Sequence, residues 1–318
     1  MTIAYVFPGQ GAQVVGMGRE LAAHYPAARA IFAQADATMD YALSDLCFAG
    51  PEAELMATEH AQPALLATGI AALAAVAGDT DVAAWVATEV ACVAGHSLGE
   101  YTALVAAGAI DLQSALRLVR RRGELMAAAR GGAMAAVIGL HADALDAVCL
   151  AASDASSQVV VANYNAPGQL VISGDAAAVE RASVLARNAG AKRVLALKVS
   201  AAFHSPLMAE AAAGLRATIN STAIGDARVP VIANVSGAPI QRAAEIRAEL
   251  AAQVTAPVRW IASVEHMAAR GTTRVIEFGP GTVLTGLVRR IAPEIACYNV
   301  ADPAGVAHTL ASVLPEPA

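Results

Sequence analysis

The sequence predicts an α/β fold in which a large domain with a parallel sheet is interrupted by a small inserted domain. In residues 1–130, short β-like runs such as IAYVF (3–7) and VACVA (90–94) alternate with long alanine-rich helical runs. This alternation is typical of a parallel sheet covered by helices. Strands and helices follow one another more closely in residues 131–198, and the first pattern returns in residues 199–318.

Composition favours a compact globular protein with a sizeable core. The 318 residues are 57% hydrophobic and 15% charged, and that length suits one large and one small domain. The net charge of −6 lacks the basic footprint of a nucleic-acid-binding protein, so we expect no nucleic-acid partner. An acidic substrate would have to be bound by local arginines.

Neither metal binding nor a membrane location is expected. The four cysteines have no metal or disulfide spacing, which favours a reducing, cytoplasmic compartment. The N-terminal MTIAYVFPGQ lacks a basic signal-peptide region and suggests a first strand and turn. The apolar stretch 61–78 reaches membrane-span length only by including polar residues such as Gln62, so it is expected to be a buried helix.

The inserted segment has the βαββαβ order of a ferredoxin-like domain. Its expected elements are a strand at 132–140, a helix at 141–153, strands at 157–165 and 170–174, a helix at 175–190 and a strand at 191–200. Asp175 is expected to cap the second helix. The large sheet then resumes with a strand at 228–235, a helix at 243–253 and a strand and turn at 273–281.

A serine lies in the pattern G-x-S-x-G at residues 95–99 (GHSLG), after an apolar run and before a helical one. In that context the pattern predicts the nucleophile elbow of an α/β-hydrolase-like domain. The glycines permit a tight turn that exposes the Ser97 oxygen, and the Leu98 amide at the helix N-terminus is placed to stabilise an oxyanion. The alternative is a glycine-rich turn with an idle serine.

A serine nucleophile needs a base, and the chain has seven histidines. Three lie in or beside helical surface patterns: His24, His60 and His141. His96 is expected to form a wall of the site. His204, in VSAAFHSPLM (199–208), lies where the chain returns from the insertion to the main sheet. Its position alone leaves a core role and a catalytic role equally open.

One arginine falls on the apolar face of a helix. In DLQSALRLVRRRGELMAAA (111–129), helical periodicity groups Arg122 with Leu116 and Val119, whereas Arg120 faces outward with Glu124. A buried arginine needs an anion. The partner is either an internal carboxylate or the carboxylate of a substrate.

Nine motifs occur in one order along almost the whole chain, and with them the sequence resembles the malonyl-coenzyme A:acyl carrier protein transacylase family of acyltransferases. The motifs are FPGQGAQ, AQPALLATGIAAL, GHSLGEYTALVAAGAI, RRRGELM, ANYNAPGQLVISG, AAFHSPLM, NVSG, QVTAPVRW and EFGPG. The resemblance implies transfer of a malonyl group from malonyl-CoA to the phosphopantetheine thiol of acyl carrier protein, for fatty acid synthesis. It also implies a monomer that needs no cofactor.

The resemblance assigns the catalytic roles. Ser97 would be the nucleophile and His204 its base, in a pair without a carboxylate; the backbone carbonyl of Gln253 would orient the imidazole instead. The amides of Gln10 and Leu98 would bind the oxyanion.

The resemblance also assigns the acyl pocket. Arg122 would bind the malonyl carboxylate. Phe203 occupies a position that goes with malonyl selectivity in related polyketide acyltransferases with HAFH, although this chain has AAFH.

Other functions remain to be tested. A serine esterase or thioesterase could use Ser97, Asp175 and His204 as a triad, but it would have no use for Arg122. A non-catalytic docking protein would not need the intact site. A free-standing acyltransferase that loads a polyketide synthase shares all these motifs, and the transferase subunit of a malonate decarboxylase shares fewer.

Overall fold

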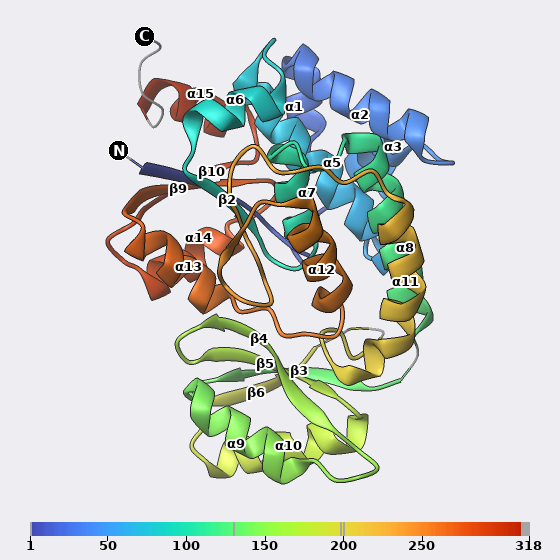
Figure 1. The fold of residues 1–318 in the computed structure, drawn as a ribbon, viewed down its shortest axis with the longest axis vertical. Coiled ribbons are helices and arrows are strands. Elements are labelled where there is room, and N and C mark those ends of the chain that lie inside the picture. The colour runs from blue at the N-terminus through green and yellow to red at the C-terminus, as the bar shows by residue number, and fades with distance from the viewer. Residues whose placement is uncertain (1, 130, 198, 200, 313–318) are drawn as a thin grey trace.

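The computed structural model describes residues 2–129, 131–197, 199 and 201–312, which form two separate sheets (Figure 1). The larger sheet has the strand order β10-β9-β1-β2-β7-β8. Its strands are β1 (Thr2–Phe7), β2 (Cys92–Gly95), β7 (Val231–Ile232), β8 (Pro239–Ile240), β9 (Thr272–Phe278) and β10 (Ala296–Val300). All neighbouring pairs are parallel except β7 and β8. The predicted parallel sheet is thus confirmed, with one antiparallel edge strand.

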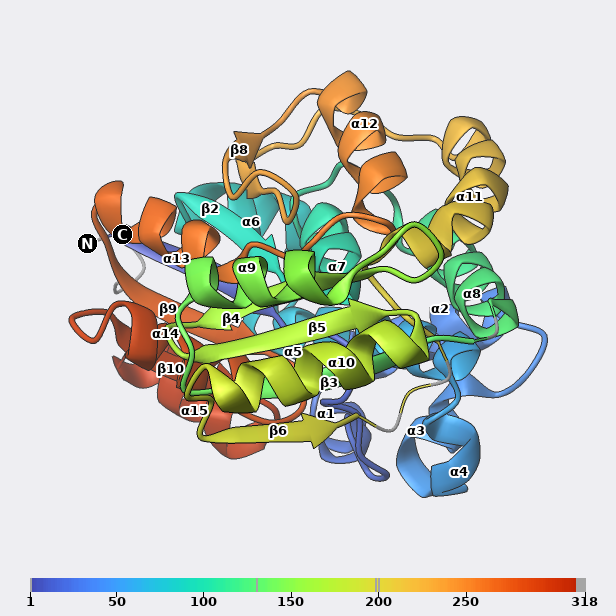
Figure 2. The same ribbon diagram turned by 90° about the horizontal axis from the view of Figure 1, so that it is seen from below.

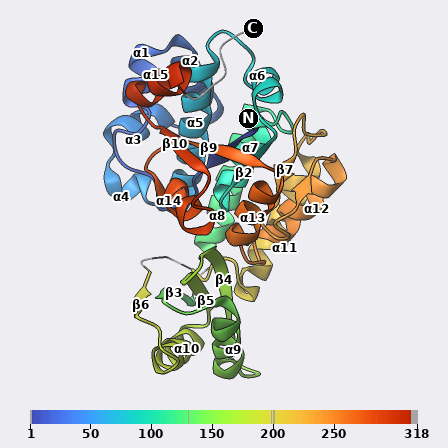
Figure 3. The ribbon, with the colours of Figure 1, turned by 90° about the vertical axis from the view of Figure 1, so that its left-hand side faces the viewer.

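Helices cover both faces of the larger sheet (Figures 1 and 3). The helices in this part of the molecule, some of which pack on other helices, are α1 (Arg19–His24), α2 (Pro26–Thr38), α3 (Leu43–Ala49), α4 (Glu52–Leu55), α5 (Thr58–Ala77), α6 (Val82–Glu89), α7 (Leu98–Ala106), α8 (Leu112–Ala128), α11 (Ala209–Ser221), α12 (Ala243–Gln253), α13 (Trp260–Ala269), α14 (Val283–Ile291) and α15 (Pro303–Ser312), with the 3-10 helix η1 (Pro206–Met208).

The central strand β1 is apolar throughout because both of its faces are buried. Ile3, Tyr5 and Phe7 pack into the core beneath α5, α7 and α8, and the alternate residues Ala4 and Val6 pack against α13 and α14. The end of β1 and the end of β2 meet at the same edge of the sheet, because Phe7 pairs in parallel with Gly95. The loops that follow these two strands therefore lie together.

Helix α5 is long and apolar enough to cross a membrane, but 94% of its apolar window is buried inside the protein. It contacts α8, α2 and α7. This confirms the expectation of a core helix at residues 61–78.

The smaller sheet has the strand order β4-β5-β3-β6, and all of its pairs are antiparallel. Its elements are β3 (Ala133–Ile138), α9 (Ala142–Ala152), β4 (Val159–Ala166), β5 (Gln169–Gly174), α10 (Ala176–Asn188) and β6 (Arg193–Ala196). Both helices cover the same face (Figure 2). The predicted βαββαβ order is confirmed. The predicted domain limits, residues 130 and 198, lie outside the described residues and stay a prediction.

Strand β4 joins the smaller sheet to the larger part of the molecule (Figure 3). The Tyr164 amide donates to the Val258 carbonyl at 2.9 Å, and the Val258 amide donates to the Ala162 carbonyl at 2.9 Å. This bridge places the end of β4 beside the segment that precedes α13.

The strand expected at residues 228–235 is much shorter in the structure, where β7 contains only Val231 and Ile232. Pro230 has no amide proton to donate to a ladder, so the strand begins after it. The chain turns away directly after β7, where the Ala233 amide donates to the Ala238 carbonyl at 2.9 Å. Asn234 therefore lies in a turn, and its side chain contacts the backbone of Gly95 and Ser97.

Substitution of Gly99 can test how closely α7 packs on β1. A Cβ on Gly99 would lie 2.0 Å from the Phe7 carbonyl oxygen, whereas a Cβ on Gly286 in α14 would meet nothing within 4 Å. We expect Gly99→Ala to lower the free energy of unfolding by roughly 1–3 kcal/mol because the backbones must move apart, and Gly286→Ala to leave it unchanged or slightly raised. Urea denaturation of both variants measures this, and equal midpoints would contradict the packing.

Candidate active site

Ser97 lies in a strained turn between β2 and α7. Its backbone has φ 51° and ψ −105°, a conformation that non-glycine residues rarely adopt. Close packing supports the turn, because a Cβ on Gly95 would lie 1.9 Å from the backbone of Gly99. The Ser97 amide donates to Asn234 Oδ1 at 2.7 Å, and Asn234 Nδ2 donates to the Gly95 carbonyl at 2.7 Å. These contacts form the elbow that the sequence predicts.

His204 lies directly beside the serine. Its Nε2 is 2.7 Å from Ser97 Oγ. Its Nδ1 faces two backbone carbonyls, those of Gln253 at 2.9 Å and Ala256 at 3.1 Å. Because carbonyl oxygens only accept, Nδ1 carries the proton and Nε2 is left to accept one from the serine. The structure therefore brings together the serine, the histidine and the Gln253 carbonyl that the resemblance grouped.

The carbonyls that face His204 come from the end of α12 and from the turn that follows it. Gln253 is the last residue of α12, so its carbonyl has no partner within the helix. The C-terminal end of a helix also carries a partial negative charge that favours a positive imidazolium. The helix end thus stands where a hydrolase triad would place a carboxylate.

His204 is neutral in the resting site. Its side chain is buried, and burial, together with the positive charge of Arg122, lowers its pKa to about 3. A neutral imidazole is the form that accepts a proton from the serine.

Arg122 is buried within the same cluster, on α8. Its Nη1 donates to Gln62 Oε1 at 2.8 Å, and its Nη2 donates to Gln253 Oε1 at 3.0 Å and to Ser97 Oγ at 3.1 Å. Its guanidinium carbon lies 5.2 Å from the centre of the Tyr101 ring. Helical periodicity was sufficient to predict that this side chain faces inward, while Arg120 pairs with Glu124 on the outside.

Arg122 has no acidic partner among the described residues, where no ion pair within 4.0 Å involves it. Its Nε is buried and has no hydrogen-bond acceptor. Of the two expectations for Arg122, an internal ion pair is therefore wrong. A buried guanidinium that bonds only to neutral groups leaves its charge uncompensated, which is an arrangement suited to an anionic ligand.

Two backbone amides near the serine are unpaired. Leu98 is the first residue of α7 and Gln10 follows β1, and within the described residues neither amide donates to an acceptor in the protein. A Cβ on Gly9 would lie 2.4 Å from the His96 carbonyl oxygen, so the loop after β1 runs against the elbow. The Gln10 side chain points elsewhere and donates to Thr58 Oγ1 at 3.2 Å.

His96 and Phe203 are the chain neighbours of Ser97 and His204. His96 Nε2 is 2.8 Å from Asn165 Oδ1 of β4, and its ring centre is 5.8 Å from that of Trp260. Its ring nitrogen is thus engaged by the smaller sheet, and its role as a wall of the site stays a prediction. Phe203 is buried in the main core next to His204.

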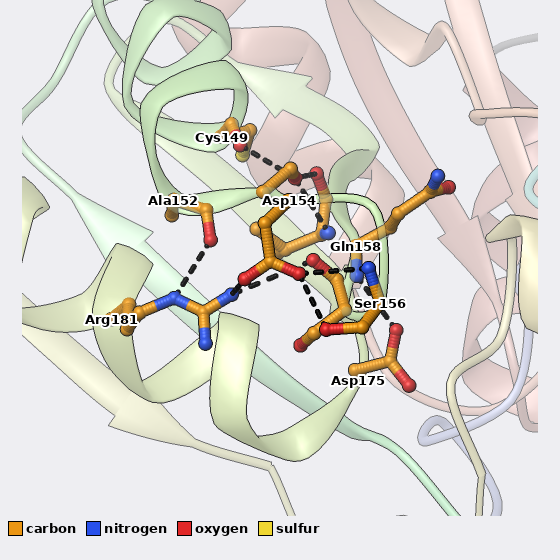
Figure 4. A network of polar contacts seen from close by, with 10 residues as sticks. Cys149, Ala152, Asp154, Ser156, Gln158, Asp175 and Arg181 are labelled. Carbon is orange, nitrogen blue, oxygen red and sulfur yellow. Dashed lines mark hydrogen bonds and ion pairs between the residues drawn. The ribbon is translucent and has the colours of Figure 1, made fainter.

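The esterase triad is contradicted by the position of Asp175. Its carboxylate accepts from the Gln158 amide at 2.7 Å, in a network of the smaller sheet that includes Asp154 and Arg181 (Figure 4). His204 Nδ1 faces carbonyls instead. Asp175 does occupy the N-cap position of α10, but its side chain makes no capping bond, because it is bound to Gln158.

Sequence reasoning missed several polar residues of the cluster. Gln62 is fully buried in α5, and Asn234 is buried in the turn after β7. Gln62 was noted only as a polar interruption of an apolar stretch. A buried amide at such an interruption could have indicated a partner for a buried charge.

The low pKa of His204 has a measurable consequence. A base with an ordinary pKa near 6.5 is protonated by about 97% at about pH 5, so kcat/KM for acylation of Ser97 would fall about 30-fold between about pH 7.5 and 5. With the pKa near 3, His204 stays neutral over this range, and we expect a change of less than about twofold. Initial rates of thiol release from a thioester substrate, at low substrate concentration, measure this. An inflection near pH 6.5 would contradict it.

Comparison with known proteins identifies the family of the chain. Residues 4–308 match the acyl transferase domain family. The chain is 45% identical to the malonyl CoA-acyl carrier protein transacylase of Bacillus subtilis (strain 168), over 95% of this chain and 94% of that protein. It superimposes with a TM-score of 0.92 on an acyl carrier protein S-malonyltransferase from Vibrio cholerae, with 41% identity over 97% of this chain and 100% of that one.

A second similar structure holds a partner. It contains a malonyl-transacylase in complex with a type II polyketide synthase acyl carrier protein, and the match has a TM-score of 0.91 and 40% identity over 98% of this chain and 99% of that one. Both sheets of the present structure fall within these matches. The chain therefore belongs to the acyl transferase domain family and, within it, to the malonyl CoA-acyl carrier protein transacylases.

Proposed function

We propose that this protein transfers the malonyl group of malonyl-CoA to the phosphopantetheine thiol of an acyl carrier protein, through a malonyl ester on Ser97. The observation that carries the proposal is the buried Arg122, which bonds to Ser97 Oγ and has no acidic partner among the described residues. A serine nucleophile beside an uncompensated cation suits an acyl group that bears a free carboxylate.

The first half-reaction loads the serine. Ser97 Oγ attacks the thioester carbonyl while His204 Nε2 accepts its proton. The unpaired amides of Gln10 and Leu98 stabilise the oxyanion. The tetrahedral intermediate then collapses, the carbon–sulfur bond breaks, and the coenzyme A sulfur leaves with the proton from His204.

The second half-reaction is the reverse with a different thiol. The carrier thiol gives its proton to His204 and attacks the malonyl ester, and Ser97 Oγ leaves with that proton. Throughout, Arg122 holds the malonyl carboxylate by paired N–H bonds. A fixed acyl group in a site that excludes water favours transfer to the thiol over hydrolysis.

The carrier protein sets the pathway. Matches include a dedicated transacylase and the transacylase of a type II polyketide synthase carrier. We propose that the protein supplies malonyl extender units for fatty acid synthesis; the second candidate, loading of a polyketide carrier, rests on the second of these matches.

We further propose that the protein is a cytoplasmic monomer with domain limits at residues 130 and 198. Phe203 is proposed to contribute to the choice of malonyl over branched acyl groups.

Mass spectrometry of the intact protein tests the function directly. After incubation with malonyl-CoA, the wild-type protein is expected to gain one malonyl group at Ser97 and to lose it when acyl carrier protein in its phosphopantetheine form is added. Ser97→Ala is expected to remain folded, since the turn is held by neighbouring backbone contacts, and to gain no malonyl group. A covalent adduct on Ser97→Ala would refute the assignment of the nucleophile.

Arg122→Ala tests how malonyl is selected. Without its partner the malonyl carboxylate is buried unpaired, which costs on the order of 2–5 kcal/mol, or roughly 30- to 4000-fold in malonyl transfer. Acetyl-CoA has no such carboxylate, so its transfer is expected to stay the same or rise. Rates for both substrates and a melting curve separate this from a general loss of structure, in which the two rates would fall together.

A further inference from the structure

Two buried glutamates lie behind the site and take no part in the proposed reaction. Glu100, on α7, is completely buried: its Oε1 accepts from the Asn234 amide at 3.0 Å, and its Oε2 accepts from Gln253 Nε2. Glu249, on α12, is also buried, and its Oε1 accepts from the Val235 amide at 2.8 Å. Burying a carboxyl group costs free energy of folding unless its oxygens are hydrogen-bonded, so these contacts need an explanation.

The two residues bound to Glu100 both reach the nucleophile. Asn234 accepts from the Ser97 amide, and Gln253 Nε2 donates to the Ser97 carbonyl at 2.9 Å. Gln253 Oε1 also accepts from Arg122, and the Gln253 carbonyl accepts from His204. Each of these groups is therefore separated from the Glu100 carboxyl by a single residue.

Glu100 determines which way the Gln253 amide points. The two ends of a glutamine amide differ, because the nitrogen only donates and the oxygen only accepts. With the nitrogen drawn to Glu100 and to the Ser97 carbonyl, the oxygen is left to face Arg122. In the flipped orientation the amide N–H groups would face the guanidinium, and the single amide oxygen would face the oxygens of Glu100 and of the Ser97 carbonyl. Both contacts would be repulsive.

Glu100 lies beside a second carboxyl group. Burial and the neighbouring Glu249 raise the pKa of Glu100 well above its usual value, and burial raises that of Glu249. Two adjacent buried carboxyl groups cannot both ionise readily. The contacts that Glu100 makes with the site are its two hydrogen bonds, from the Asn234 backbone amide and from Gln253 Nε2.

We propose that Glu100 is a positioning residue for malonyl selection: through Gln253 it holds Arg122 in place beside Ser97. The inference rests on the proposed function and adds a residue that does not touch the substrate. It distinguishes Glu100 from a merely structural residue, because loss of its acceptor would alter the preference for a charged acyl group rather than the stability alone.

The test is the ratio of kcat/KM for malonyl-CoA to that for acetyl-CoA in Glu100→Gln. The new amide has one accepting oxygen for two N–H donors, so the orientation of Gln253 is no longer enforced. We expect the ratio to fall roughly 10- to 100-fold, the usual effect of a lost hydrogen bond to a charged group. Any loss that acts through Asn234 and Ser97 affects both substrates and cancels in the ratio. An unchanged ratio would overturn the proposal.

Glu277→Gln is the matched control. Glu277 is also completely buried, and its two oxygens accept from the amides of Leu284 at 3.1 Å and Thr285 at 2.8 Å, at the start of α14. It has the same side chain and is equally buried, but these contacts serve the start of α14 and not the site. We expect this variant to melt at a lower temperature with an unchanged ratio. A ratio that falls equally in both variants would show a general effect of removing a buried carboxyl group and would also overturn the proposal.

A second variant keeps the inference testable if Glu100→Gln does not fold. Gln253→Met removes the side-chain amide but keeps the backbone carbonyl that faces His204, and it is expected to lower the ratio to a similar extent. If both single variants fold, the double variant should lose no more than either one, since the residues act in series. A normal ratio in Gln253→Met would refute the route through Gln253.

Wild-type loading separates this inference from the proposed function. If the wild-type protein forms no malonyl ester on Ser97, the proposed function fails. If it does, and Glu100→Gln keeps the full preference for malonyl, only the role of Glu100 fails.

Discussion

A buried guanidinium without an acidic partner is the constraint on which the rest of the site depends. Arg122 is 1% exposed, and in the described residues its hydrogen-bond partners are two amide oxygens and the hydroxyl of Ser97. Such a charge is tolerable only if neutral dipoles surround it. The polar residues gathered here from α5 and α12 supply these dipoles, and they fix the position of the serine in doing so.

Ser97 and His204, the proposed nucleophile and its proposed base, are both held in unusual backbone conformations. Ser97 has φ 51° and His204 has φ 56°, and no other described non-glycine residue has positive φ. Strain of this kind, of order 1–3 kcal/mol per residue, persists only where the surroundings leave no alternative. Around Ser97 these surroundings are the close-packed glycines of the elbow and the side-chain amides of Asn234 and Gln253. The His204 ring is held by the backbone carbonyl at the end of α12. The geometry of the pair therefore depends on main-chain packing and on side-chain hydrogen bonds together.

Much of this arrangement could be predicted from local patterns. The elbow at residues 95–99 has a fixed spacing, the βαββαβ order follows from alternating periodicities, and helical periodicity alone places Arg122 inside. The grouping of His204 with Gln253 came only from family resemblance, since nothing in either segment encodes their contact. The roles of Gln62, Asn234 and Glu100 could not be predicted, because each depends on a hydrogen bond to a residue at least 60 positions away. The short β7 shows a further limit. The apolar residues 228–235 predicted a longer strand, but Pro230 has no amide proton and the strand contains only Val231 and Ile232.

Strand β4 has a consequence for how the molecule loses its structure. Its backbone is hydrogen-bonded to Val258, and Asn165 at its end bonds to His96, the residue next to the nucleophile. The smaller sheet thus contacts the site and is not a separate appendage. If β4 came away from the larger part of the molecule, His96 would lose its acceptor Asn165 and Val258 would lose its backbone partners. Local opening of β4 is therefore expected to disturb the site as well. We therefore expect thermal inactivation to coincide with melting of the smaller sheet.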